Sequence, residues 1–228
     1  MRQFLLAALL LLIGSQAVTA QTSQYTSAKD SDPEAVALVK QLRSKYDGFR
    51  TLEADFRLDI SLPGQQVETQ TGKISRQGDM VRFKLGPQEG IITDKAAYLI
   101  QHGNKEVMIS NLPEAGEQTG VLTPQTLFDF YEGDNYVLAL RGKETVAGRN
   151  VSVIELKPLD RENSEFTKLR LLVDAAKKEI VSVRAFTPDG ANFTFHLDKT
   201  RGNIALAGNT FVFDKKDFPG YYVEDLRY

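Results

Sequence analysis

Cysteine is absent from this chain of 228 residues, and so is tryptophan. Without cysteine the chain can form no disulfide, no thiolate metal site and no N-terminal lipid anchor, and thiol catalysis and redox exchange are excluded. The formal net charge is only −2, which offers no large basic field for nucleic acid or anionic lipid. Ordinary apolar packing therefore has to supply the core, and the length is ample for that.

Residues with catalytic potential are scarce as well. The chain has no G-x-S-x-G elbow, no histidine cluster with metal spacing and no glycine loop for phosphate. His102 falls in an expected turn and His196 on the polar side of an expected strand, and neither has a serine or an acid at motif spacing. We predict that the chain is not an enzyme and that it holds no metal and no cofactor.

Only the beginning of the chain contains an extended apolar run. Arg2 precedes the run from Phe4 to Ile13, and Val18-Thr19-Ala20 ends this segment with residues that a signal peptidase accepts. The run is too short for a membrane-spanning helix, which needs about 20 residues. We predict a secretory signal over residues 1–20, a flexible tether over 21–30 and one domain over 31–228.

Two helices are expected in that domain. Ser31-Asp32-Pro33-Glu34 supplies a capping residue, a first-turn proline and an acid near the positive end of the helix dipole, and an amphipathic pattern then runs to Asp47. Thr123-Pro124 begins a second, short helix that ends at Tyr131. The residues expected to form the apolar faces of these helices are Val36, Val39, Leu42, Tyr46, Leu127, Phe128 and Tyr131.

Most of the remaining chain alternates between apolar and polar residues. The pattern is cleanest from Leu52 to Leu62 and recurs from Phe166 to Phe213, which is typical of antiparallel strands with one wet face. The polar stretch 65–75 is expected at an edge or in a solvated region. We predict a mainly β protein of the α+β class, with about 10–11 strands in an unclosed antiparallel half-barrel and helices over its concave face.

The order of these elements resembles the outer-membrane lipoprotein carrier (LolA) family. Leu52-Glu53-Ala54-Asp55-Phe56 follows the first helix, as in that family. The ending, Asn209-Thr210-Phe211-Val212-Phe213 and then Phe218-Pro219-Gly220-Tyr221-Tyr222-Val223, is similar to the family's F-x-F and P-x-G-V-x-V, although Phe-Pro-Gly here replaces the simple Pro-x-Gly spacing. The resemblance covers about Ser31 to Val223.

The resemblance implies that the two helices form a lid over an apolar cavity. It also implies a function: carrying the acyl chains of lipoproteins across the periplasm, from an inner-membrane lipoprotein-releasing transporter to an outer-membrane acceptor. We expect a monomer that does not bind nucleic acid. The candidate cavity residues are Leu52, Ala54, Phe56, Leu58, Phe83, Leu171, Val183, Phe193, Phe195 and Phe211.

In the family, a cavity arginine hydrogen-bonds to the closed lid, and Arg76 and then Arg82 are the candidates for that role here. Two other functions stay open: a lipid- or lipoprotein-sensing module, such as an envelope-stress regulator or a carrier of another lipid, and an enzyme acting on lipids. The missing nucleophile disfavours the enzyme. For each aromatic ring, an ordinary dry core is the alternative to a lipid-lined cavity.

Overall fold

One continuous sheet of twelve strands organises the protein in the computed structural model, which describes residues 27–112 and 135–227. The expected helix 123–131, with Leu127, Phe128 and Tyr131, lies outside the described residues. The strands are β1 (Thr51–Ser61), β2 (Glu68–Gln77), β3 (Met80–Leu85), β4 (Gln88–Ile92), β5 (Ala97–Gln101), β6 (Glu106–Ser110), β7 (Tyr136–Val146), β8 (Arg149–Pro158), β9 (Lys168–Asp174), β10 (Glu179–Phe186), β11 (Asn192–Gly202) and β12 (Tyr222–Asp225).

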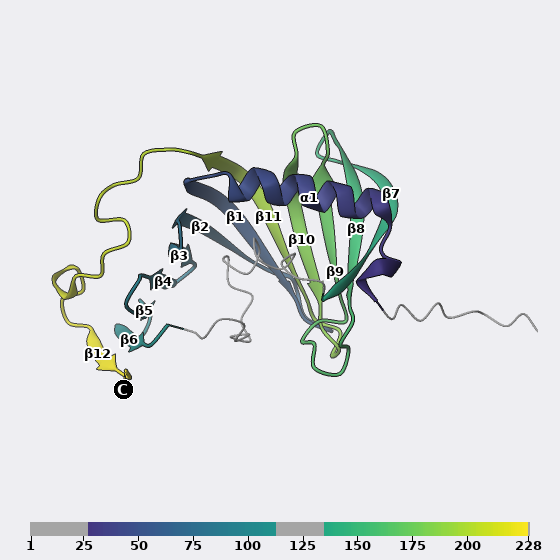
Figure 1. Ribbon diagram of the computed structural model, residues 1–228. Coiled ribbons are helices and arrows are strands. Elements are labelled where there is room, and N and C mark those ends of the chain that lie inside the picture. Colours follow the sequence, from purple (N-terminus) through teal and green to yellow (C-terminus); the bar gives the residue numbers. More distant parts are fainter. Residues whose placement is uncertain (1–26, 113–134, 228) are drawn as a thin grey trace, which may run out of the picture.

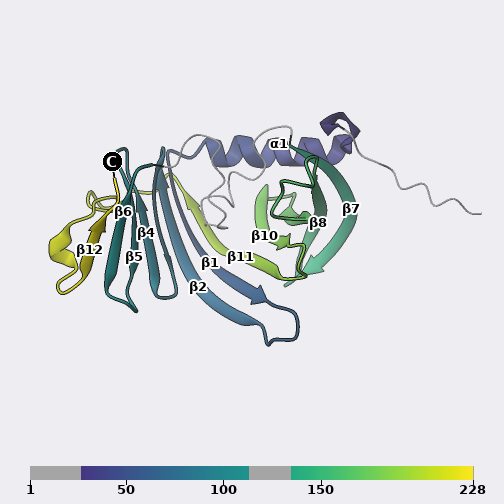
Figure 2. The same cartoon turned by 90° about the horizontal axis from the view of Figure 1, so that it is seen from below.

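The sheet is open and strongly curved. Its order is β12-β6-β5-β4-β3-β2-β1-β11-β10-β9-β8-β7, so that β12 and β7 form the two edges and do not pair with each other. Figure 1 shows helix α1 (Pro33–Asp47) lying across the strands from β1 to β7, and Figure 2 shows the curvature from below. This arrangement confirms the predicted unclosed half-barrel with a helix on its concave face.

Two strands show how the sequence patterns relate to the sheet. The polar stretch after Pro63-Gly64 forms β2, which lies in the middle of the sheet between β1 and β3 rather than at an edge. It can remain polar there because most of its first half is exposed, which agrees with the alternative of a solvated strand. Tyr136 to Leu140 and Gly142 to Val146 alternate like two separate strands, but they form one strand, β7, which continues through a bulge at Gly142, where φ is 112°.

Helix α1 begins at Pro33, and its N-terminus is attached to the edge strand β7. The amide of Asp32 donates to the oxygen of Leu138 (2.8 Å), and the amide of Leu140 donates to the Asp32 carboxylate (2.7 Å). The sequence suggested a side-chain cap at the start of α1, but the Asp32 side chain does not cap the helix. Its carboxylate instead accepts a hydrogen bond from the edge strand β7. The last residues of the expected tether, Ala28–Asp30, form a turn of 3-10 helix, η1.

Beyond β11 the chain departs from the expected strand. Residues 203–221, here called the C-terminal segment, contain turns and one short 3-10 helix, η2 (Lys215–Asp217), instead of a strand from Ile204 to Phe213. The chain then forms β12, which pairs with β6 in parallel, so that the sheet is not a purely antiparallel meander. Figure 1 shows this part in yellow, beside β6.

The two faces of the sheet carry separate cores. On the concave face, the buried residues Ala35, Val39, Leu42 and Tyr46 of α1 pack against strands β1–β3 and β8–β11. On the opposite face, Phe218 of the C-terminal segment packs with buried residues of β4–β6 and the loop between them, namely Ile91, Ala96, Ile100, Val107 and Ile109. Strands β3 to β6 are here called the wing. The core under α1 ends at β3 and the adjacent Ile92, and the C-terminal segment covers the convex side of β4–β6.

Candidate functional site

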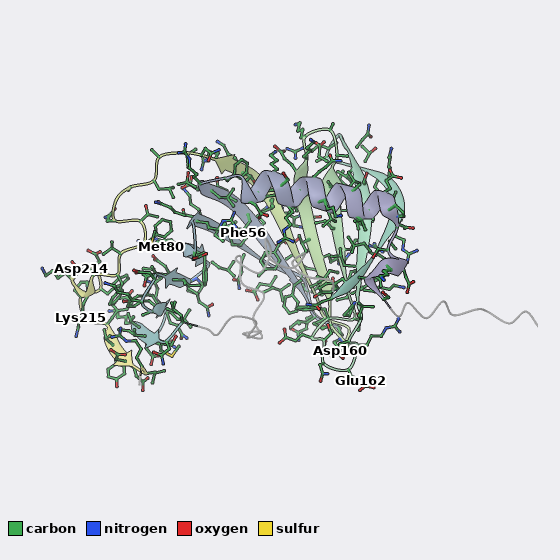
Figure 3. The ribbon with its side chains drawn as sticks, in the orientation of Figure 1. Phe56, Met80, Asp160, Glu162, Asp214 and Lys215 are labelled. Atoms are coloured by element: carbon green, nitrogen blue, oxygen red, sulfur yellow. The ribbon has the colours of Figure 1, made fainter. Side chains whose placement is uncertain are left out.

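Strand register brings most of the candidate cavity residues onto one face. Leu58 pairs with Phe195, and Phe195 pairs with Val183, which in turn pairs with Leu171. These residues, with Leu52, Ala54 and Phe56, belong to the core under α1, and none is more than 5% exposed. In the described structure they contact the helix and one another, and Phe56 lies on the sheet below α1 (Figure 3).

The other three candidate cavity residues lie outside the buried part of this core. Phe83 of β3 and Phe193 of β11 are half-buried at the margins of the same core. Phe211 belongs to the C-terminal segment, where it lines a cavity of about 580 Å³ together with Met80, Tyr98 and Phe213. Phe211 is therefore separated from the concave core, because the segment that carries it is not the strand expected from its alternation.

The C-terminal turn of α1 is held by polar contacts. Arg76 of β2 donates from Nη2 to the backbone oxygen of Tyr46 (2.9 Å), and the amide of Ile180 donates to the Tyr46 hydroxyl (3.2 Å). Burial raises the pKa of the Tyr46 phenol to about 12, so the group stays neutral at physiological pH. Lys45 donates to the oxygen of Lys177 (3.0 Å). Of the other candidate lid residues, Val39 and Leu42 are buried and Val36 is half-buried.

Arg82, the second candidate for the lid arginine, lies on the opposite face. In the β2–β3 hairpin it pairs with Ser75, whereas Arg76 pairs with Val81, so the two arginines point to different sides of the sheet. Arg82 forms an ion pair with Glu89, which is 1% exposed, and donates from Nη1 to the oxygen of Thr210 (3.0 Å). It thereby ties the C-terminal segment to the wing and does not hold α1.

The concave face of the wing carries apolar side chains that stay partly exposed, although Phe83, Leu85 and Ile92 pack against the margin of the core under α1. Five residues alternate onto this face and are half-buried: Phe83, Leu85, Ile92, Leu99 and Met108. On the convex face of the same strands, Tyr98 stacks on Phe213 with ring centroids 4.6 Å apart, and Phe213 stacks on Phe218 at 5.4 Å. The wing is thus apolar on both faces, and, within the part of the chain that the structure describes, the C-terminal segment covers the convex one.

Phe83 lies flat against a glycine on this surface. Gly90 is its cross-strand partner on β4, and a Cβ atom at Gly90 would come within 2.2 Å of the Phe83 ring. Only glycine leaves room for the ring in this position. Phe56 has the same relation to Gly72, but the Phe56 ring is buried in the core under α1.

Sequence reasoning missed most of the wing. Leu85, Ile92, Leu99, Met108 and Gly90 were not among the candidate site residues. A signal was present, because Tyr98-Leu99-Ile100 and Val107-Met108-Ile109 are continuous apolar triplets in short strands. Such runs are typical of strands with both faces buried.

The two histidines have structural partners. His196 Nε2 lies 3.0 Å from the Asp59 carboxylate, and His102 Nδ1 lies 2.9 Å from the Tyr221 hydroxyl. Within the described ranges, no group of three or more histidine, aspartate and glutamate side chains is arranged to hold a metal ion. In the same part of the chain, no helix is long and apolar enough to cross a membrane.

An unclosed half-barrel with a helix on its concave face defines the structural class, and solved structures share it. An uncharacterized conserved protein from Thermus thermophilus is 9% identical, with a TM-score of 0.55 over 86% of this chain and 99% of that chain. At this identity the similarity concerns the fold alone. No family model and no curated protein matches the sequence.

Two further similar structures have lower TM-scores. A putative outer membrane lipoprotein-sorting protein domain from Vibrio parahaemolyticus is 14% identical, with a TM-score of 0.43 over 78% of this chain and 96% of that one. A LolA superfamily protein from Nitrosomonas europaea is 10% identical, with a TM-score of 0.39 over 79% and 98%.

Proposed function

We propose that this chain is a periplasmic carrier that binds the acyl chains of lipoproteins on its concave face and moves lipoproteins from the inner to the outer membrane. The observation that supports this most directly is the wing, which is apolar on both faces while its concave residues, such as Leu99 and Met108, are only half-buried. An apolar surface of this kind on an exported protein fits a hydrophobic ligand.

The energetics explain why a shallow, partly open surface suits this task. Each buried methylene contributes about 0.8 kcal/mol, so exposing three long acyl chains to water costs on the order of 30 kcal/mol. Unaided transfer through the periplasm is therefore negligible. A site that recovered all of this energy would not release its cargo, since useful affinities saturate near about −20 kcal/mol.

Helix α1 is the proposed lid, with Arg76 as the residue that holds it closed. The bond from Arg76 to the Tyr46 oxygen joins the sheet to the last turn of the helix, which is the geometry that a lid contact requires. Loading from an inner-membrane transporter and unloading to an outer-membrane acceptor belong to the same proposal. The carrier works as a monomer without catalysis, metal or cofactor.

Two experiments test the proposal. The first is to purify the protein from the periplasm, identify bound lipid by mass spectrometry and measure whether the protein releases lipoproteins from inner-membrane vesicles. We expect bound acyl lipid and release of lipoprotein into the soluble fraction. If neither is found, the carrier function is wrong.

The second experiment is depletion of the protein in its host. A carrier leaves mature lipoproteins in the inner membrane, and membrane fractionation with blotting for a lipoprotein detects this. If depletion instead changes envelope-stress transcription while lipoproteins stay in their normal membrane, the chain is a sensing module.

A further inference from the structure

We propose that the concave face of the wing is the acyl-binding subsite and that it selects lipids whose head group carries no negative charge, with the Phe83 ring over Gly90 as its floor. This inference rests on the proposed function. It specifies which part of the concave face binds the acyl chain and which chemical class of lipid is accepted.

Burial separates the wing from the rest of the concave face. Under α1, Phe56 and Phe195 are 2% and 1% exposed, so this part is already filled by protein. The wing offers Leu99 and Met108, which are half-buried, lie on the same face of the sheet and are not part of the core under α1, whereas Leu85 packs at its margin. A chain laid across these residues removes apolar surface from water, and it reaches the margin of the α1 core at Phe83.

The flat position of Phe83 sets the depth of the subsite. Since a Cβ atom at Gly90 would lie 2.2 Å from the ring, any larger residue forces the ring away from the sheet and into the space above it. The pair of Gly90 and Phe83 therefore keeps the floor low enough for a ligand. In the Gly72 and Phe56 pair, the same change disturbs the core beneath the helix instead.

Charge on this face disfavours a phosphate. On the concave face of strands β1 to β6 the only basic residue is Arg76, and its guanidinium donates to the Tyr46 oxygen at the end of α1. The rim of the wing has the cross-strand pair Gln88 and Gln101, followed by Lys105 and Glu106, whose opposite charges leave the rim with no net positive charge. Amide side chains can form hydrogen bonds with esters, amides and hydroxyls. Moving an anion out of water without a cationic partner is, by contrast, unfavourable.

The test uses two lipids with the same chain, 1-lauroylglycerol and 1-lauroylglycerol 3-phosphate, each below its micelle concentration at low salt. Leu99→Trp places the only tryptophan of the chain opposite Gly90, and its fluorescence reports binding. We expect the uncharged lipid to bind at least about tenfold more tightly than the phosphate. Equal affinities overturn the selectivity and leave the proposed function intact, whereas binding of neither lipid counts against the proposed function itself.

Variants at exposed Gln88 separate charge from packing. Gln88→Lys puts a cation on the rim but removes an amide partner, so we expect it to improve binding of the phosphate and to weaken binding of the uncharged lipid slightly. Gln88→Glu is the matched control and should weaken the phosphate further. If the ratio of the two lipid affinities is the same in both variants, the rim of the wing does not face the head group, and the proposed selectivity for uncharged lipids is wrong.

The floor is tested by a pair of substitutions in the same reporter background. Gly90→Ala should weaken binding of both lipids, and adding Phe83→Leu should restore it, because leucine removes the ring that the new methyl displaces. Circular dichroism checks that each variant is folded. If Gly90→Ala lowers the thermal midpoint but leaves lipid binding unchanged, the wing is a structural surface and not the subsite.

Discussion

The side chains of Arg76 and Arg82 point to opposite faces of the sheet, and this direction decides which part of the protein each one contacts. They belong to one hairpin, yet Arg76 reaches the end of α1 and Arg82 reaches the C-terminal segment. Alternation in the sequence indicates two faces, but not which face becomes concave, because that depends on the partner strands. Both arginines were therefore reasonable candidates for the lid contact, and only one lies beside the helix.

Arg76→Ala is expected to loosen the last turn of α1. It removes a charged donor from the Tyr46 oxygen, a bond worth about 1.5–3 kcal/mol, and amide exchange in residues 43–49 should become faster. If α1 is a lid, lipid affinity should rise as well, because the closed state loses a contact that the open state lacks. Hydrogen exchange with mass spectrometry and a lipid titration measure the two effects.

Arg82→Ala is the matched control for that variant. It should speed up exchange in the C-terminal segment and leave α1 unchanged, since Arg82 contacts Glu89 and Thr210. A similar response of α1 in both variants would mean that the Arg76 contact does not hold the helix.

Glu155 of β8 provides a pH-dependent prediction. Burial alone would raise the pKa of this carboxyl, but hydrogen bonds from Arg170, Lys168 and Arg141 lower it from 4.5 to about 2. A lowered pKa in the folded state means that Glu155 contributes stability above pH 4.5 and loses it as the pH falls toward 2. Glu155→Gln should cost about 1–3 kcal/mol at pH 7.

Urea unfolding between pH 7 and pH 2.5 measures this difference. The gap between Glu155→Gln and the unaltered protein should narrow as the pH decreases through this range. Asp160→Asn, in an exposed loop at the end of the strands away from α1 (Figure 3), should change stability little at any pH. A gap that stays constant down to pH 2.5 would contradict the assigned role of Glu155.

At the scale of elements, local patterns predicted α1 well and the C-terminal segment poorly. The amphipathic spacing of Val39, Leu42 and Tyr46 is a property of one helix and can be seen without any partner. Phe211 and Phe213 alternate like strand residues, but a strand also needs a free edge to pair with. At that point β1 already has β2 and β11 as neighbours, so the segment crosses the convex face instead and pairs only at β12.

Phe218→Ala is expected to release the C-terminal segment. Phe218 is 8% exposed, stacks on Phe213 and meets Tyr221 at 5.5 Å, so its removal leaves a cavity in the convex core. The cost should be about 3–5 kcal/mol for a truncated aromatic residue. Hydrogen exchange should become faster in β12 and in the segment, while α1 keeps its protection. Uniform acceleration across the sheet would show that the two cores are not separate.

For the whole molecule, the fold class was predictable, whereas the location of the exposed apolar surface was not. The alternating strands and an amphipathic helix are sufficient for a curved, half-covered sheet. Which strands the helix covers depends on how far it reaches across them, and the C-terminal segment then decides which face of the wing is closed. Leu99 and Met108 can be recognised as candidate ligand contacts only when the positions of α1 and of the C-terminal segment are both known.

Ligand binding on the wing should stabilise only the neighbouring part of the sheet. Lipid bound on the concave side of the wing should stabilise strands β3–β6 and, through the pairing of β6 with β12, the C-terminal end. At a free concentration of about 100 times Kd the gain is about 2.7 kcal/mol, which for a domain of this size raises the thermal midpoint by about 5–10 °C. Exchange should slow in β3–β6 and β12 and stay unchanged in β8 and β9, which lie at the other end of the sheet. Protection that appears first in β8 and β9 would place the ligand under α1 and not on the wing.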